Sequence, residues 1–288
     1  MTMQGRICLI TGGTNGIGKS TALALARMGA TVVIVGRDAQ KTAQVVEEIR
    51  TVSGNPKVDS LLADLSSQQE IRRLAQEFKS RYSHLHVLLN NAGGVFLQRQ
   101  LSVDGIEMTF ALNHLAYFLL TNLLLDTIKA SAPARIINVS SGVHTSGKIE
   151  FDNLQGERSY GSAAYPNSKL ANVLFTTDLA RRLEGTRVTV NALHPGFVAT
   201  GFGKNNGRII AALISLFTPL IARSPAKGAE TSVYLASSPS VEGVTGQYFY
   251  NSRAVPASPH AADGVVARKL WEVSAEMTHL TDGLPATV

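Results

Sequence analysis

The chain has 288 residues, 44% of them hydrophobic and 17% charged, which is enough to bury a sizeable core and excludes a disordered protein. Its net charge of +6 is spread along the sequence without a long basic block, which argues against a nucleic-acid-binding surface. The single cysteine, Cys8, rules out an internal disulfide and a multi-cysteine metal site. We therefore expect a buried thiol and no bound metal.

The N-terminal residues lead directly into an apolar, β-branched run, without the separate apolar region of a signal peptide. No uninterrupted apolar stretch reaches about 18 residues, so we predict no transmembrane helix. Together with the sparing use of cysteine, these features favour a cytoplasmic location.

Short β-branched runs alternate with longer amphipathic stretches along nearly the whole chain. The predicted strands are 6–11, 31–36, 58–62, 86–90, 135–140, 187–193 and 246–250. The predicted helices are about 16–29, 38–53, 66–81, 105–129, 159–184 and 225–237. This alternation predicts an α/β fold: one Rossmann-type, doubly wound parallel sheet of about seven strands with helices on both faces. No linker or repeat divides it, so residues 1–288 are expected to form a single domain.

A glycine-rich turn follows the first predicted strand, with the sequence Thr-Gly-Gly-Thr-Asn-Gly-Ile-Gly at residues 11–18. Gly12 permits a sharp turn, Gly16 removes a side chain where a pyrophosphate must approach, and Gly18 allows close contact between helix and strand. The free amides and positive dipole end of the following helix favour an anion. The turn therefore indicates a dinucleotide site, whereas the alternative is a tight turn with no ligand.

The second predicted strand ends with Gly36, Arg37 and Asp38. An acidic residue at the strand tip would bind the adenosine ribose hydroxyls, whereas an arginine suits a 2′-phosphate. Arg37 thus favours NADP(H) over NAD(H). The alternatives are that Arg37 is a solvated arginine at the start of a helix, and that Asp38, as the N-cap of that helix, favours NAD(H).

A hydroxyl and an ammonium group are predicted to lie together further along the chain. Tyr165 and Lys169 are four residues apart at the start of a predicted helix, which places them on one side of it. A tyrosine is a poor acid or base at neutral pH, and we expect the ammonium of Lys169, together with the positive charge of an oxidised nicotinamide, to lower the pKa of Tyr165. The fifth predicted strand ends in Ser140 and Ser141, which can present a hydroxyl to a substrate carbonyl.

With these motifs in order along nearly the whole chain, the sequence resembles the short-chain dehydrogenase/reductase family. The resemblance implies a catalytic group made of Asn113, Ser141, Tyr165 and Lys169, with Ser140 as the second choice for the serine. It also implies contacts with the cofactor from residues of several segments. These are Gly12, Thr14, Asn15, Gly16, Ile17, Gly18, Arg37, Asp64, Leu65, Asn91, Ala92, Gly93, Tyr165, Lys169, Pro195, Gly196, Val198 and Thr200.

The family resemblance also implies a mechanism. Hydride passes between the nicotinamide and a carbonyl carbon, Tyr165 exchanges the proton of the oxygen, and Ser141 donates a hydrogen bond to that oxygen. Lys169 would hold the nicotinamide ribose, and Asn113 would support a water relay. Finer similarity points to retinol dehydrogenase-like members, for example in Asn113-His114-Leu115 and the late Leu270-Trp271. Pro166, directly after the tyrosine, is tolerable only if the helix begins close by.

One long irregular segment, 200–224, is predicted to be an insertion on the cofactor side of the sheet. It carries the apolar run 209–221 between Arg208 and Arg223. Three interpretations stay open: a lid over a lipophilic substrate, a core or subunit-interface helix, and a shallow membrane contact.

The sequence therefore predicts an NADP(H)-dependent enzyme that interconverts a lipophilic aldehyde or ketone and its alcohol, as a homodimer or homotetramer. Two alternatives are kept. One is an NAD(H)-linked dehydrogenase of the same family, and the other is a dinucleotide-binding regulator without turnover.

Overall fold

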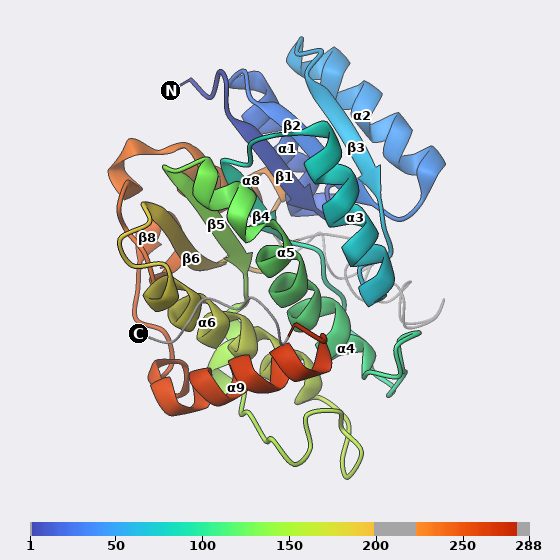
Figure 1. Ribbon diagram of the computed structural model, residues 1–288, viewed down its shortest axis with the longest axis vertical. Coiled ribbons are helices and arrows are strands. Elements are labelled where there is room, and N and C mark those ends of the chain that lie inside the picture. The colour runs from blue at the N-terminus through green and yellow to red at the C-terminus, as the bar shows by residue number, and fades with distance from the viewer. Residues whose placement is uncertain (1, 199–222, 281–288) are drawn as a thin grey trace.

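The computed structural model describes residues 2–198 and 223–280, to which all structural statements below refer. The described residues form an eight-stranded sheet in the order β3-β2-β1-β4-β5-β6-β7-β8 (Figure 1). Neighbouring strands from β3 to β7 pair in parallel, and β8 pairs antiparallel with β7 at one edge. The strands are β1 Ile7–Thr11, β2 Thr31–Gly36, β3 Val58–Leu62, β4 Val87–Asn90, β5 Ala134–Val139, β6 Val188–His194, β7 Tyr248–Tyr250 and β8 Arg253–Ala254.

Helices cover both faces of this sheet. One face packs against α1 Gly16–Arg27, α2 Ala39–Ser53 and α8 Pro225–Ser237. The other packs against α3 Gln68–Arg81, α5 Ala116–Ala130 and α6 Ala164–Arg182, with α9 Gly264–Met277 lying against α6 (Figure 1). The short α4 Met108–Phe110 runs through a π-helical turn, Ala111–Leu115, into α5, and 3-10 turns occupy Gly142–Ser146, Pro239–Val241 and Pro259–Ala262.

The alternation of side chains along the strands explains why both faces are covered. On β1, Cys8 and Ile10 pack against the α1 face, while Leu9 between them packs against the α3 and α5 face. All three side chains are fully buried, as expected for a parallel strand with helices on both sides. Burial raises the pKa of the Cys8 thiol to about 12, so this cysteine is an unreactive part of the core.

The predicted doubly wound fold is confirmed, and seven predicted strands match observed ones to within two residues. The sequence analysis missed two elements: β8, which is only two residues long, and helix α9. The start of α9 carries a recognisable signal, because the Asp263 side chain accepts hydrogen bonds from the Val265 and Val266 amides. The predicted insertion at 200–224 lies outside the described residues except for Arg223 and Ser224.

Two helices begin later than predicted, each for a local reason. The helix expected from 105 begins at Met108, because Gly105 adopts a φ of +72° and the Glu107 carboxylate caps the helix instead. The helix expected from 159 begins at Ala164. Pro166 therefore falls in its first turn, where its missing amide hydrogen costs no intrahelical bond.

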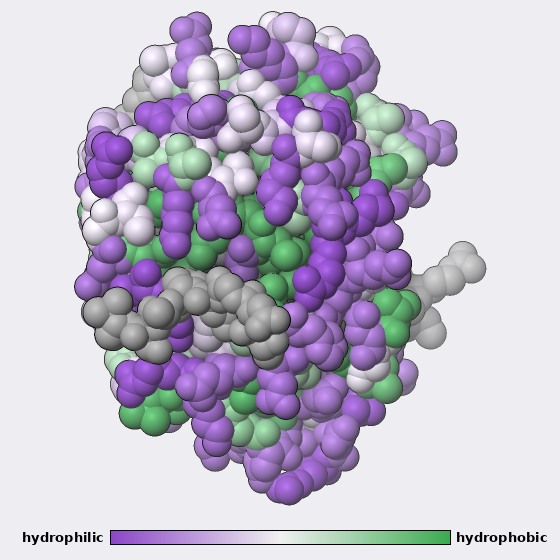
Figure 2. Space-filling view, viewed as in Figure 1, coloured by the Kyte–Doolittle hydropathy of each residue, from purple (hydrophilic) through white to green (hydrophobic). Residues whose placement is uncertain are grey.

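The stretch Met108–Ala130 is long and apolar enough to cross a membrane by length and composition. In the fold, however, most of its apolar window is buried, because α5 packs against the centre of the sheet. The face seen in Figure 2 is mostly hydrophilic, with hydrophobic residues in several small patches. These properties describe a core helix of a globular domain.

Candidate active site at the carboxyl edge of the sheet

The segments that carry the predicted site residues all leave the sheet at its carboxyl edge. The strand order reverses between β1 and β4, since β1 is followed by β2 on one side while β4 begins the other half. In open parallel sheets, ligands bind in the crevice outside such a reversal. The glycine turn after β1 and the loop after β4 lie on either side of it.

The glycine turn and the loop after β4 are packed directly against each other. A Cβ on Gly12, whose φ is +64°, would lie 2.9 Å from the Cα of Ala92, and one on Gly18 would collide with the carbonyl oxygen of Gly12. Asn91 Nδ2 donates to the carbonyl of Thr11 at 2.8 Å, and Thr11 Oγ1 accepts from the amides of Asn91 and Ala92. The two segments are thus held in one fixed arrangement.

The start of α1 offers amide groups to an anion. The Asn15 side chain caps the helix by accepting from the Gly16 amide at 2.8 Å, and Gly16 itself has a φ of +53°. The next amides, of Ile17 and Gly18, fall in the first helical turn, where no intrahelical acceptor exists. The turn therefore fits a dinucleotide pyrophosphate.

The end of β6 reaches the same place. Gly196 has a φ of +85°, and Val198 forms a bridge with Arg223. The side chain of Val198 lies 2.6 Å from the position that a Cβ on Gly228 would take, and Ile17 Cγ1 lies 3.3 Å from that position. Val198 is thus beside the start of α1, and Pro195 and Gly196 precede it. Thr200 lies outside the described residues.

Arg37 lies at the tip of β2 with its side chain exposed, and it makes no hydrogen bond or ion pair within the described part of the chain. Gly36 beside it leaves no room for a Cβ, which would lie 2.6 Å from Thr14 Cγ2. The carboxylate of Asp38 accepts from the Lys41 amide and caps α2. The acidic group is therefore engaged in the helix, whereas the guanidinium is available.

Asp64 and Leu65, two of the implied cofactor contacts, follow β3 and differ in exposure. Asp64 is exposed and accepts hydrogen bonds from both the amide and the hydroxyl of Ser66. Leu65 is 7% exposed and packs into the core beneath α3. The structure thus leaves Asp64 at the surface, while the Leu65 side chain serves the core.

Tyr165 and Ser141 meet at the centre of the edge. Tyr165 is the second residue of α6, and its phenol is hydrogen-bonded to the Ser141 side chain. Ser140, the second choice from the sequence, points the other way and donates to the Lys169 carbonyl at 2.7 Å. The alternation of the chain after β5 thus places one serine in the site and the other in a structural contact.

Lys169 is buried beside this pair. Its side chain is 3% exposed, and Nζ lies 5.5 Å from the centre of the Tyr165 ring. Nζ donates to the Val139 carbonyl at 3.1 Å, and no other acceptor for it is found in the described residues. Two of its three donor positions are therefore open to a ligand, which fits the hydroxyls of a cofactor ribose.

Burial dominates the electrostatics of the pair. Burial lowers the pKa of Lys169 to about 7, and burial raises the pKa of Tyr165 above its ordinary value, partly offset by the Ser141 hydrogen bond. Burial is the largest effect on the Tyr165 pKa in the protein without cofactor. The predicted lowering includes the charge of an oxidised nicotinamide, so it concerns the cofactor-bound state and stays a prediction. At neutral pH Tyr165 is a protonated phenol and Lys169 is only partly charged.

Asn113 lies in the π-helical turn with its side chain fully buried. Its amide bridges two segments: Oδ1 accepts from the Gly94 amide at 2.8 Å, and Nδ2 donates to the Gly94 carbonyl and to Ser168 Oγ. A Cβ on Gly93 would lie 2.9 Å from Oδ1. Asn113 therefore joins the loop after β4 to the helix that carries Tyr165 and Lys169.

Three residues that support Ser141 escaped the sequence analysis. His144 Nδ1 lies 2.8 Å from the Ser141 carbonyl, and its Nε2 accepts from the Ser258 amide at 3.1 Å. The Tyr248 hydroxyl donates to the same carbonyl at 3.2 Å. Because His144 and Ser258 are 114 residues apart, no local spacing pattern connects them.

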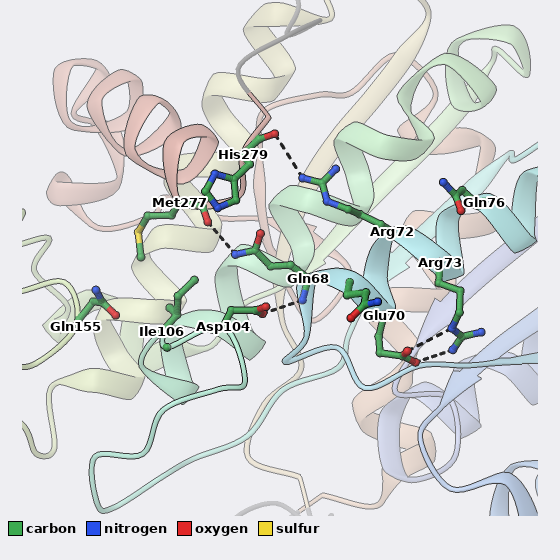
Figure 3. A pocket seen from close by; sticks show the side chains of 12 residues that line it. Gln68, Glu70, Arg72, Arg73, Gln76, Asp104, Ile106, Gln155, Met277 and His279 are labelled. Atoms are coloured by element: carbon green, nitrogen blue, oxygen red, sulfur yellow. Dashed lines mark hydrogen bonds and ion pairs between the residues drawn. The ribbon is translucent and has the colours of Figure 1, made fainter.

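A cavity of about 800 Å³ lies elsewhere, between α3, the loop before α4 and the end of α9 (Figure 3). Gln68 Nε2 donates to the Met277 carbonyl, and Arg72 donates to the carbonyls of Thr278 and His279. None of the predicted catalytic side chains lines it. The volume of this cavity therefore does not identify the residues that can perform chemistry.

Comparison with known proteins identifies relatives that cover most of the chain. The model of the family described as short chain dehydrogenase matches residues 6–209. Retinol dehydrogenase 14 of Homo sapiens is 44% identical, with 96% of this chain and 88% of that protein covered. Retinol dehydrogenase 13 of Homo sapiens is 43% identical, with 97% and 86% covered.

Solved structures agree with the fold. An uncharacterized protein from Mycobacterium paratuberculosis is 31% identical, with a TM-score of 0.77 and coverage of 96% of this chain and 95% of that one. The Pseudomonas aeruginosa RhlG/NADP active-site complex is 29% identical, with a TM-score of 0.67 and coverage of 86% and 95%.

Proposed function

We propose that this chain, which belongs to the short-chain dehydrogenase family, uses NADP(H) to interconvert a lipophilic aldehyde or ketone and its alcohol. Membership of the family makes it an NAD(P)-dependent oxidoreductase of alcohols and carbonyl compounds, and its relatives make it retinol dehydrogenase-like. The choice of cofactor, the substrate class and the roles of individual residues are the proposal.

One observation carries the proposed chemistry: the Tyr165 phenol is hydrogen-bonded to Ser141 beside the buried Nζ of Lys169. A protonated phenol and a serine hydroxyl that both face one point can bind a single carbonyl oxygen. Tyr165 then transfers its proton to that oxygen during reduction and receives it back during oxidation. Ser141 stabilises the negative charge that develops on the oxygen.

When bound, the cofactor supplies or accepts the hydride. The glycine turn would hold its pyrophosphate, and the two open donor positions of Lys169 would hold the hydroxyls of its nicotinamide ribose. Asn113 keeps the loop after β4 and α6 in register through Gly94 and Ser168. These contacts align the reacting atoms before the substrate arrives, which is the main source of rate that a rigid scaffold can offer.

The preference for NADP(H) rests on Arg37. Its exposed guanidinium has no partner in the described residues, while the neighbouring carboxylate of Asp38 is used as a helix cap. A 2′-phosphate would form charge-assisted hydrogen bonds with this guanidinium. An NAD(H)-linked enzyme is the competing possibility.

The lipophilic substrate is supported by the relatives named retinol dehydrogenases and by apolar residues at the site edge. Phe197, between Gly196 and Val198, is 64% exposed. The apolar run 209–221, predicted as a lid, lies outside the described residues. The cytoplasmic location, the possible membrane contact and the homodimer or homotetramer stay predictions.

The test follows nicotinamide absorbance with NADPH and then NADH against a panel of aliphatic and aromatic aldehydes and ketones of increasing length. We expect turnover with NADPH, rising with the apolar size of the substrate. Cofactor binding without turnover of any substrate would favour a non-catalytic regulator, and faster turnover with NADH would favour the NAD-linked enzyme.

A further inference from the structure

The amino edge of the sheet, opposite the active site, carries a row of basic residues. Strands β1, β4, β5 and β6 are adjacent in the sheet. Arg6, His86 and Arg187 each directly precede one of these strands, and Arg135 is the second residue of β5. Four neighbouring strands therefore each present a basic side chain at the same edge.

These four residues line one cavity of about 420 Å³, together with the N-terminal residues Thr2 and Met3 and the segment after α8. That volume is in the range of small-molecule sites. Glu242 is the one acidic residue in its lining. Three guanidinium groups thus share the cavity with a single carboxylate.

The arginines are not neutralised by the protein. None of the three forms an ion pair within 4 Å in the described residues. Arg6 donates one hydrogen bond to the Pro133 carbonyl, Arg135 donates one to the Leu235 carbonyl, and the Arg187 side chain makes none. Since a guanidinium has five N–H donors, most of their donor capacity is open.

The groups also repel one another. The pKa of Arg135 is lowered by burial and by the charge of Arg6, with Glu242 acting in the opposite direction. The pKa of His86 is lowered by burial and by Arg6 and His84. His86 Nδ1 accepts from the Ile7 amide at 3.1 Å, so the neutral ring carries its proton on Nε2 as a further donor.

We propose that this amino-edge cavity binds a phosphate-bearing anion through Arg6, Arg135 and Arg187. Guanidinium groups match phosphate oxygens in geometry and hold their charge at any physiological pH. A bound phosphate dianion offsets the repulsion that the protein leaves unbalanced. This site is separate from the cofactor site, because the two lie at opposite ends of the same strands.

The experiment titrates inorganic pyrophosphate by calorimetry into protein saturated with NADP⁺, so that the glycine turn and Arg37 are occupied. The double variant Arg6→Gln with Arg187→Gln should bind pyrophosphate about a hundredfold more weakly, because each of the two lost charged hydrogen bonds is worth about a factor of ten. Glu242→Gln should bind it several-fold more tightly. Arg37→Gln, on the cofactor side, should bind it as the wild type does.

Vesicles distinguish the two sources of such a phosphate. The ligand is a lipid headgroup if the wild-type protein floats with phosphatidic acid vesicles but not with phosphatidylcholine vesicles, and if the double variant floats with neither. Pyrophosphate binding without flotation assigns a soluble phosphate ester. The proposal is overturned if wild-type protein binds neither probe, or if Arg37→Gln abolishes pyrophosphate binding while the double variant retains it. Since Glu242→Gln acts in the opposite direction, an unfolded double variant still leaves a decisive measurement.

Discussion

The two edges of the sheet are formed by the same strands but have opposite chemistry. At the carboxyl edge, the polar side chains around Tyr165 and the glycine turn are tied to each other and to the backbone, and Lys169 beside Tyr165 is 3% exposed. At the amino edge, three arginines face one cavity and keep most of their donors open. The sheet supplies only the frame, and the residues just beyond each strand end determine what each edge can bind.

Replacing the Tyr165 phenol at the carboxyl edge should have the largest effect on activity. Tyr165→Phe removes the proton donor but keeps the ring, so we expect kcat to fall by about 10²–10⁴-fold, the usual contribution of general acid–base catalysis. Cofactor affinity should change little. Steady-state kinetics and cofactor titration measure both effects. Tyr82→Phe, whose hydroxyl binds Asp59 away from the site, is the matched control and should keep full activity.

Lys169→Met should separate stability from function. Burial lowers the Lys169 pKa from 10.5 to about 7, a change that corresponds to about 5 kcal/mol as an upper figure. Between these values the unfolded chain binds a proton that the folded protein does not, so wild-type stability rises with pH across this window.

Without cofactor, the Lys169→Met variant should therefore be more stable than the wild type below pH 7, by up to several kcal/mol. This advantage should vanish near pH 10.5, and activity should be lost throughout. Denaturant unfolding at a series of pH values tests it. Equal pH dependence in both proteins would show that Lys169 keeps its ordinary pKa.

Gly18→Ala should disturb the contact between the glycine turn and the loop after β4. The added Cβ collides with the Gly12 carbonyl and lies 2.6 Å from Asn91 Nδ2. We expect a loss of about 1–3 kcal/mol of stability, as for other overpacked sites, and weaker cofactor binding. Gly161→Ala, where nothing lies within 4 Å of the new Cβ, should leave stability unchanged. Thermal unfolding compares the two variants.

Arg37→Gln should have the smallest effect, confined to one cofactor. We expect the KM for NADPH to rise about tenfold, since one charge-assisted contact with the 2′-phosphate is lost. The KM for NADH should not change. Arg27→Gln, an exposed arginine at the end of α1, serves as the control. A parallel loss with both cofactors would contradict a specific role in binding the 2′-phosphate.

The sequence predicted local features well because their signals are local. The glycine turn lies within one short segment of the sequence, and so does the four-residue spacing of Tyr165 and Lys169. Pro166 correctly required a helix that begins nearby. The pKa of Tyr165 could not be read in the same way. Its direction depends on how much of the fold covers the phenol, which no spacing reports.

The residues that support Ser141 could not be predicted from the sequence either. The Ser141 turn is held by His144, Tyr248 and the Ser258 amide, which come together only when the last strands have joined the sheet. The basic row at the amino edge was hidden for the same reason. Its members are separated by 49 residues or more in the chain, and only the strand order makes them neighbours.

Helix α9 has a consequence for synthesis on the ribosome. Its Trp271 and Ala275 complete the apolar core formed with α3, α5 and α6, and the carbonyls after its last turn are held by Gln68 and Arg72 (Figure 3). A nascent chain that has emerged only as far as β8 contains every strand of the described sheet, but this apolar surface is still exposed to solvent. We expect such chains to be bound by chaperones until α9 has emerged and covers this surface.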